Sequence, residues 1–192
     1  MTTLEPSEEP RIQLAESPYS EAVALIMNRA APALAEPLLL FRALAVNERV
    51  FARVMAGGLL DRGSISIRER EIIIARTTFR CGAEYEWGVH VATYSSRAGF
   101  TPQQVRELCA KDPATTAFCG PERSLLLLCD ELHDTASVSD GLWKELSSHY
   151  TARQLVEIVA VAGYYHLIAF VVNTFRLPNE YFGARFESEA PP

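Results

Sequence analysis

The chain of 192 residues has a formal net charge of −6, with 48% hydrophobic and 22% charged residues. This length is enough for one domain with a sizeable core, and the composition is ordinary for a globular protein, so no second domain is required. The acidic balance argues against a nucleic-acid partner, because neutralising phosphates needs clustered Lys and Arg, and the only lysines are Lys111 and Lys144.

The N-terminal segment has neither a basic start nor an apolar core, so it does not match a secretory signal. We predict a disordered lead over residues 1–18 and a cytoplasmic protein in which the cysteines stay reduced. Their spacing fits no common zinc pattern, which favours structural thiols over metal ligands. The four cysteines are Cys81, Cys109, Cys119 and Cys129.

Helix signals dominate the first part of the chain. Residues 20–30 are predicted to form a short helix, which two prolines follow. Residues 38–60 carry a longer amphipathic pattern that ends near a glycine pair. Ser66 and Glu69 then match a capping box, in which the serine oxygen accepts from an exposed amide while the glutamate reaches back. A helix that contains Glu71 is expected to begin there.

The second part continues with helices. Gly82 is expected to separate the Glu71 helix from the next one, and Gly99 to end that next helix. Thr101 and Thr151 each open a Thr-x-x-Gln pattern, which predicts two similarly capped helices. Because no period-2 strand pattern or hairpin turn occurs, we predict an all-α, single-domain helical bundle. The other predicted helices cover residues 83–98, 122–135 and 139–148.

Residues 158–172 are apolar nearly all round the predicted helix. The run is too short and too polar to span a bilayer, which needs about 20 apolar residues. A helix without a wet face must be covered on every side, and in so small a domain part of that cover can come from another copy. We therefore predict a homo-oligomer.

A cluster of chemically capable residues occupies positions 80–90, where the sequence is RCGAEYEWGVH. Glu86 and His90 lie one helical turn apart and can touch. Upstream, Glu71 falls in the middle of an apolar stripe, where a carboxylate must be paired or protonated. If the two helices pack antiparallel, Glu71 meets the face that carries Glu86 and His90.

These residues resemble the carboxymuconolactone decarboxylase and alkylhydroperoxidase D-like superfamily. The resemblance covers residues 36–100 well and residues 161–173 more loosely. In the peroxidase branch a glutamate precedes a Cys-x-x-Cys pair and a histidine follows. Here the glutamate falls on Glu71 and the histidine on His90, but the cysteine positions fall on Ala83 and Glu86. We predict one domain of this kind over residues 19–183 and a flexible tail over residues 184–192, and the resemblance implies trimers or hexamers.

The missing thiol pair argues against the peroxidase chemistry of the superfamily, because a lone cysteine has no resolving partner at that spacing. A Glu, Glu and His set is suited to moving protons. The resemblance to the decarboxylase branch implies lyase-type chemistry on a small ring-derived carboxylic acid or lactone. We predict a cofactor-independent, lyase-like enzyme of this kind, with His90, Glu86 and Glu71 as catalytic residues. The alternatives are a thiol-dependent peroxidase that uses Cys81, and a non-enzymatic oligomeric binding or scaffold protein.

The remaining candidates carry less specific signals. A metal held by the Glu and His set is disfavoured, because bundle di-iron sites need a second Glu and His pair, so we predict no metal. His133 and His149 lie near predicted helix ends, and His166 lies on the apolar helix, where packing explains a histidine. Residues that could contact a substrate are Cys81, Glu84, Trp87, Tyr94 and Tyr165.

Overall fold

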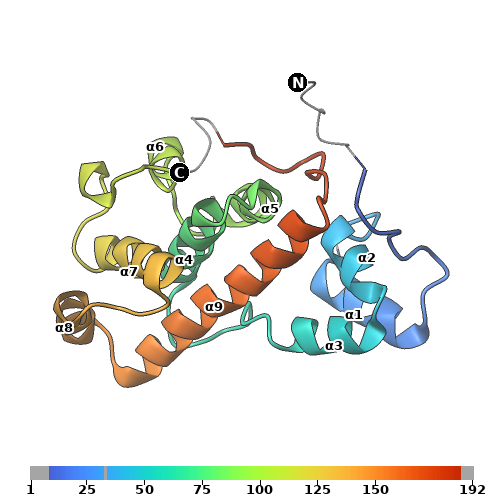
Figure 1. Ribbon diagram of the computed structural model, residues 1–192, viewed down its shortest axis with the longest axis horizontal. Helices are drawn as coiled ribbons and strands as arrows, with labels where there is room; N and C mark the ends of the chain where they lie inside the picture. The colour runs from blue at the N-terminus through green and yellow to red at the C-terminus, as the bar shows by residue number, and fades with distance from the viewer. Residues whose placement is uncertain (1–8, 33, 187–192) are drawn as a thin grey trace.

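The computed structural model describes residues 9–32 and 34–186, and within them the chain is helical without a strand (Figure 1). The all-α, single-domain prediction is confirmed. The elements are α1 (Glu21–Ala30), α2 (Leu39–Ala45), α3 (Glu48–Ala56), α4 (Ile67–Arg80), α5 (Glu84–Tyr94), α6 (Pro102–Glu107), a 3₁₀ turn (Pro113–Thr115), α7 (Pro121–Thr135), α8 (Asp140–His149) and α9 (Ala152–Thr174).

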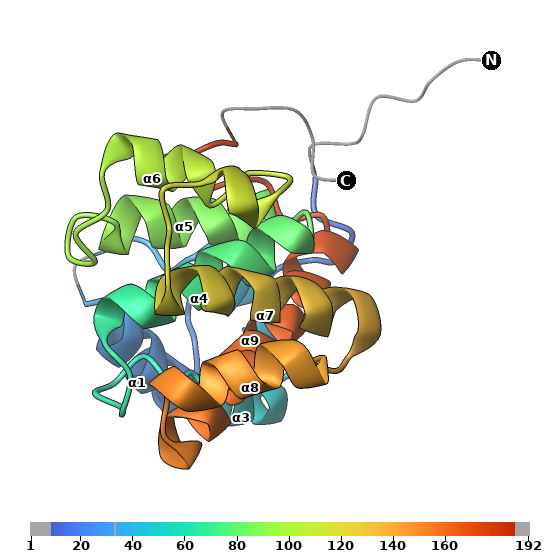
Figure 2. The same cartoon turned by 90° about the vertical axis from the view of Figure 1, so that its left-hand side faces the viewer.

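Helix α4 lies at the centre of the molecule, against α5, α7 and α9 (Figure 2). Every residue from Arg70 to Phe79 is buried, so this helix has no wet face along most of its length. Its three consecutive isoleucines pack in the core, and its buried charged side chains are paired, Arg70 with Glu71 and Arg76 with Asp130. Helices α1–α3 gather at one end, and α9 begins near α8 and runs towards them (Figure 1).

The predicted helix starts are confirmed. Ser66, Thr101 and Thr151 each form a complete capping box at the start of α4, α6 and α9. In each box the side-chain oxygen accepts from one otherwise unpaired amide and the Glu or Gln accepts from a second, which fixes where the helix begins.

Two predicted helices have different bounds. Residues 38–60 form two helices, because the Asn47 side chain accepts a hydrogen bond from the Val50 amide and so caps a new helix. The helix predicted over 83–98 is α5, which ends at Tyr94 and continues as turns up to Gly99, whose φ is 69°. A left-handed residue there closes the turn without steric cost because it is glycine.

Both predicted flexible ends are held against the bundle in their described parts. The Arg11 amide donates to the Phe175 carbonyl (2.9 Å), and the Ala15 amide to that of Arg42 (3.1 Å). This corrects the disordered lead for residues 9–18; residues 1–8 lie outside the described residues. In the predicted tail, Ala184 donates to the Gly88 carbonyl, and residues 187–192 lie outside the described residues.

Among the residues that the structure describes, one helix, α9, is long and apolar enough to cross a membrane by length and composition alone. Its buried positions pack against α4, α5 and α8, which is the arrangement of a core helix. Its outward positions form an apolar stripe at i, i+3, i+7, i+11 and i+14. These stripe residues are Val156, Val159, Gly163, Leu167 and Phe170, of which Val156 is 72% and Phe170 66% exposed.

Candidate functional site

The predicted Glu71, Glu86 and His90 cluster is assembled between α4 and α5. Gly82, with a φ of 62°, lets the chain reverse between the two helices, so that Glu71 faces His90. His90 Nδ1 lies 2.8 Å from Glu71 Oε2, and His90 Nε2 lies 3.4 Å from Glu86 Oε1. All three side chains are buried, with 2–5% of each residue exposed. The expected contact between the two helices is therefore present.

Two further residues complete the cluster. The guanidinium of Arg70 donates to Glu71 Oε1 at 3.0 Å and also to the Leu60 carbonyl. Tyr165, from α9, places its hydroxyl 3.0 Å from His90 Nε2. With His90 protonated, two cations and two carboxylates sum to zero charge. This balance explains how four ionisable side chains can be buried together.

The protonation state of His90 follows from its neighbours. Burial lowers the pKa of the imidazole, but its hydrogen bonds to Glu71 and Glu86 and the charges of those carboxylates outweigh burial and raise the pKa to about 9. His90 is thus a cation at neutral pH, with an N–H on both nitrogens. Burial, together with the charges of Glu86 and Glu71, raises the pKa of Tyr165, so its hydroxyl keeps its proton.

One atom of the cluster has unused hydrogen-bonding capacity. Glu86 Oε2 is buried and has no hydrogen-bond partner among the residues that the structure describes. A narrow, partly open crevice adjoins the cluster. It is lined by Glu71, Ala75, His90, Val91, Ser95 and Phe100. Glu86, whose oxygen Oε2 has no partner, is not among these lining residues.

The residues predicted to contact a substrate do not lie together. Tyr94 and Tyr165 lie at the cluster, each with its ring about 5 Å from that of His90. Glu84 instead accepts hydrogen bonds from the Asn179 side chain (2.7 Å) and the Phe186 amide (2.8 Å), so it anchors the C-terminal segment. Trp87 is 1% exposed and packs on Phe186 in the core.

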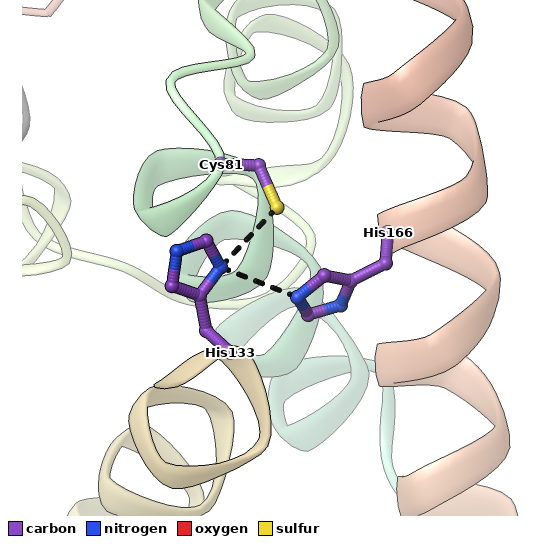
Figure 3. A group of neighbouring side chains, drawn as sticks. All are labelled: Cys81, His133 and His166. Carbon is purple, nitrogen blue, oxygen red and sulfur yellow. Dashed lines mark hydrogen bonds between the residues drawn. The ribbon is translucent and has the colours of Figure 1, made fainter. Parts of the chain in front are cut away.

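Cys81 belongs to a second cluster, which the sequence analysis did not predict. Its sulfur lies 3.6 Å from His133 Nδ1, and that nitrogen lies 3.3 Å from His166 Nε2 (Figure 3). Burial raises the pKa of the Cys81 thiol to about 11, although the nearby Arg80 charge opposes this. The pKa of His133 is lowered, by burial first and then by the charges of Arg80 and His166. Because its pKa is about 11, the Cys81 thiol is protonated at neutral pH.

Comparison with known proteins identifies the fold. No family model and no curated protein matches the sequence. A peroxidase-related protein from Silicibacter sp. TM1040 has a similar structure, with a TM-score of 0.80, 18% identity, and 97% of this chain and 100% of that chain covered. An alkylhydroperoxidase AhpD core protein from Ralstonia eutropha JMP134 gives a TM-score of 0.71 and 16% identity, over 93% of this chain and 96% of that chain.

A third similar structure is an enzyme. The debrominase Bmp8, solved as a cysteine-to-alanine variant with 2,3,4-tribromopyrrole, has a TM-score of 0.70 and 13% identity, with 94% of this chain and 95% of that chain covered. At such identities the likeness concerns the fold alone. The chain therefore has an AhpD-like fold, as the resemblance implied, and proteins of this fold include an enzyme and peroxidase-related proteins.

Proposed function

We propose that this chain is a cofactor-independent, lyase-like enzyme that transfers protons at the cluster of Glu71, Glu86 and His90. The observation that carries the proposal is an imidazolium held between two buried carboxylates, one of which keeps an oxygen free. Groups with shifted pKa values in a buried cluster are typical of acid–base sites, because the environment sets which group gives and which accepts the proton. The substrate class is a small ring-derived carboxylic acid or lactone.

We infer a separate role for each of the three residues from their contacts. Glu71 fixes the imidazole through Nδ1, which leaves Nε2–H directed at Glu86 and Tyr165. Since both imidazole nitrogens have partners within the protein, His90 reaches a substrate through Glu86, whose free oxygen is the exchange point. His90 is then the proton reservoir, Glu86 the group in contact with substrate, and Glu71 the positioning residue.

In a decarboxylation at this site, the substrate loses its carboxylate as CO₂ and gains a proton. The C–C bond to the substrate carboxylate breaks, CO₂ leaves, and the electron pair stays on the ring as an enolate conjugated to a neighbouring carbonyl. The proton of His90 Nε2, passed through Glu86, then forms the new C–H bond. Neutral His90 regains its proton from water, which its raised pKa favours at neutral pH.

The thiol-dependent alternative is less well supported. Attack by sulfur requires a thiolate, whereas burial raises the pKa of Cys81 to about 11. The scaffold alternative assigns the same buried charges a structural role only. These alternatives differ in which substitution abolishes turnover.

We also propose that the protein acts as a homo-oligomer in which a second copy covers the apolar stripe of α9. Large exposed apolar surface on one helix is typical of an interface, since its burial is worth about 25 cal/mol per Å². Val156, Leu167 and Phe170 are 42–72% exposed on this stripe.

The test uses ring lactones that carry a carboxylate, with released CO₂ as the measured product. Glu86→Gln and His90→Gln should each lower kcat by about 10²–10⁴ while the far-ultraviolet circular dichroism stays that of a helical bundle. Cys81→Ser should retain turnover. Loss of turnover in Cys81→Ser alone would support the thiol alternative, and wild-type protein without turnover on any such lactone would contradict the proposed substrate class.

A further inference from the structure

The second cluster, formed by Cys81, His133 and His166, brings together three metal-binding side chains from different helices. Cys81 caps the C-terminus of α4, His133 lies in the last turn of α7, and His166 lies in α9. Their donor atoms, one sulfur and two nitrogens, all lie within 4.8 Å of one another and point towards a common centre (Figure 3).

Two distances between these donor atoms match those of a tetrahedral metal site. For Zn–S of about 2.3 Å and Zn–N of about 2.05 Å, tetrahedral angles place the sulfur about 3.6 Å from a nitrogen and two nitrogens about 3.3 Å apart. The structure has 3.6 Å from Cys81 Sγ to His133 Nδ1, and 3.3 Å from that nitrogen to His166 Nε2. The third distance, from Cys81 to His166, is within 4.8 Å.

Hydrogen bonds within this cluster cannot pair all the donor and acceptor atoms of Cys81, His133 and His166. His166 Nδ1 lies 2.9 Å from the Ala162 carbonyl, which can only accept, so that nitrogen carries the proton. In the neutral imidazole, Nε2 therefore presents a lone pair to His133. His133 Nδ1 has at most one hydrogen, which it can donate to His166 or to the Cys81 sulfur but not fully to both. A cation at the centre would satisfy all three lone pairs.

The surroundings support a cation at this place. Metal-binding histidines commonly donate their second N–H to a carbonyl, as His166 does, because this fixes the ring orientation. The C-terminal ends of α4 and α7 converge here, and such ends favour positive charge. The charge of Arg80 lies close by, but it is paired with Asp134 at 2.6 Å and with Asp130 at 3.7 Å.

We propose that Cys81, His133 and His166 bind a divalent transition-metal ion, with Zn²⁺ as the best match. One thiolate and two imidazoles suit a borderline-soft ion, and three protein ligands leave a fourth position for water or a ligand. The ion would join α4, α7 and α9. This site is independent of the proposed proton-transfer cluster, which involves none of these three side chains.

The binding test uses full-length protein freed of metal with a chelator and titrated with Zn²⁺ or Co²⁺ alone. We expect one ion per chain, and for Co²⁺ the intense absorption of a thiolate-to-metal charge transfer. Cys81→Ser and His166→Gln should weaken binding by about a hundredfold or more, since loss of a supporting residue alone costs about 10–100-fold. Cys119→Ser and His149→Gln, which alter exposed residues outside the cluster, should bind as wild type.

A second measurement does not depend on the folding of any variant. In wild-type protein, bound Zn²⁺ should slow alkylation of Cys81 while the exposed Cys119 reacts at an unchanged rate, as followed by peptide mass spectrometry. Absence of a stoichiometric site, a Co²⁺ spectrum without the thiolate band, or equal alkylation of Cys81 with and without Zn²⁺ would each overturn the proposal.

Discussion

The protonated state of His90 predicts that the folded protein loses stability as the pH rises from neutral to alkaline. The pKa of His90 is about 9 in the folded state, against 6.5 for an unperturbed histidine. Between these values the folded state binds one more proton than the unfolded state, so the free energy of unfolding falls with pH. The stabilisation is fully present below pH 6.5 and is lost as the pH passes through the folded value.

The magnitude follows from the size of the shift. One pKa unit corresponds to about 1.4 kcal/mol, so the full loss is about 3 kcal/mol, spread over the interval between the two pKa values. With a urea dependence of about 2 kcal/mol per M, the midpoint of unfolding should fall by about 1–2 M. Urea unfolding followed by circular dichroism at fixed protein concentration, at half-unit steps from pH 6 to pH 10, measures this change.

Groups other than His90 also titrate over this range, so the comparison is between variants. His90→Gln removes the titrating group and should give a flatter profile than the wild type. His149→Gln removes an exposed histidine on α8 and should keep the wild-type slope. Parallel profiles for wild type and His90→Gln would refute the reasoning, because they would mean that folded His90 is not protonated near neutrality.

Three further predictions concern single contacts. Glu71→Gln should lower the pKa of His90, measured by NMR titration, and destabilise the fold by about 3–5 kcal/mol, because one member of a buried charge network is removed. Gly88→Ala should release the C-terminal segment and speed its tryptic cleavage, because a Cβ there would overlap the Ala184 carbonyl oxygen. Phe170→Glu should reduce the particle mass measured by light scattering, because a charge on the α9 stripe opposes burial against another copy.

Matched substitutions control these tests. Gly141→Ala adds a Cβ with nothing within 4 Å and should leave tryptic cleavage unchanged. Trp143→Glu alters an exposed residue of α8, outside the α9 stripe, and should keep the particle mass. An unchanged His90 titration in Glu71→Gln, unchanged cleavage in Gly88→Ala, or a wild type already of single-chain mass would contradict the corresponding prediction.

The helical architecture could be predicted from the sequence because its signals are local. Three capping boxes and an apolar period specify where helices begin and which of them are buried, and these features depend on residues a few positions apart. The division of residues 38–60 into two helices was missed because the amphipathic pattern is continuous there. A single residue, Asn47, caps the second helix and so separates it from the first. The order of residues 9–18 was missed because it depends on backbone hydrogen bonds to Arg42 and Phe175, far away in the chain.

The cluster of Glu71, Glu86 and His90 was predictable for the same reason. Glu86 and His90 are one turn apart, and Glu71 interrupts an apolar stripe on the preceding helix, so only one short-range packing step was needed. Tyr165 was a weaker candidate because nothing local relates it to His90. The cluster of Cys81, His133 and His166 left no local signal, since its members are 52 and 33 residues apart and each alone resembles an ordinary helix-end or core residue.

Ala83 and Glu86 occupy the two positions where the resemblance would place the cysteines of a Cys-x-x-Cys pair, and the two residues are physically consistent with each other. Ala83 is fully buried and contributes no ionisable group, whereas Glu86 adds a buried negative charge four residues before His90. A buried carboxylate needs a cation, and the imidazole supplies it once Glu71 and Glu86 together raise its pKa. A cysteine at position 86 would be neutral in its thiol form and would leave His90 with one carboxylate partner. The glutamate at position 86 thus helps to keep His90 protonated, as the proposed proton transfer requires.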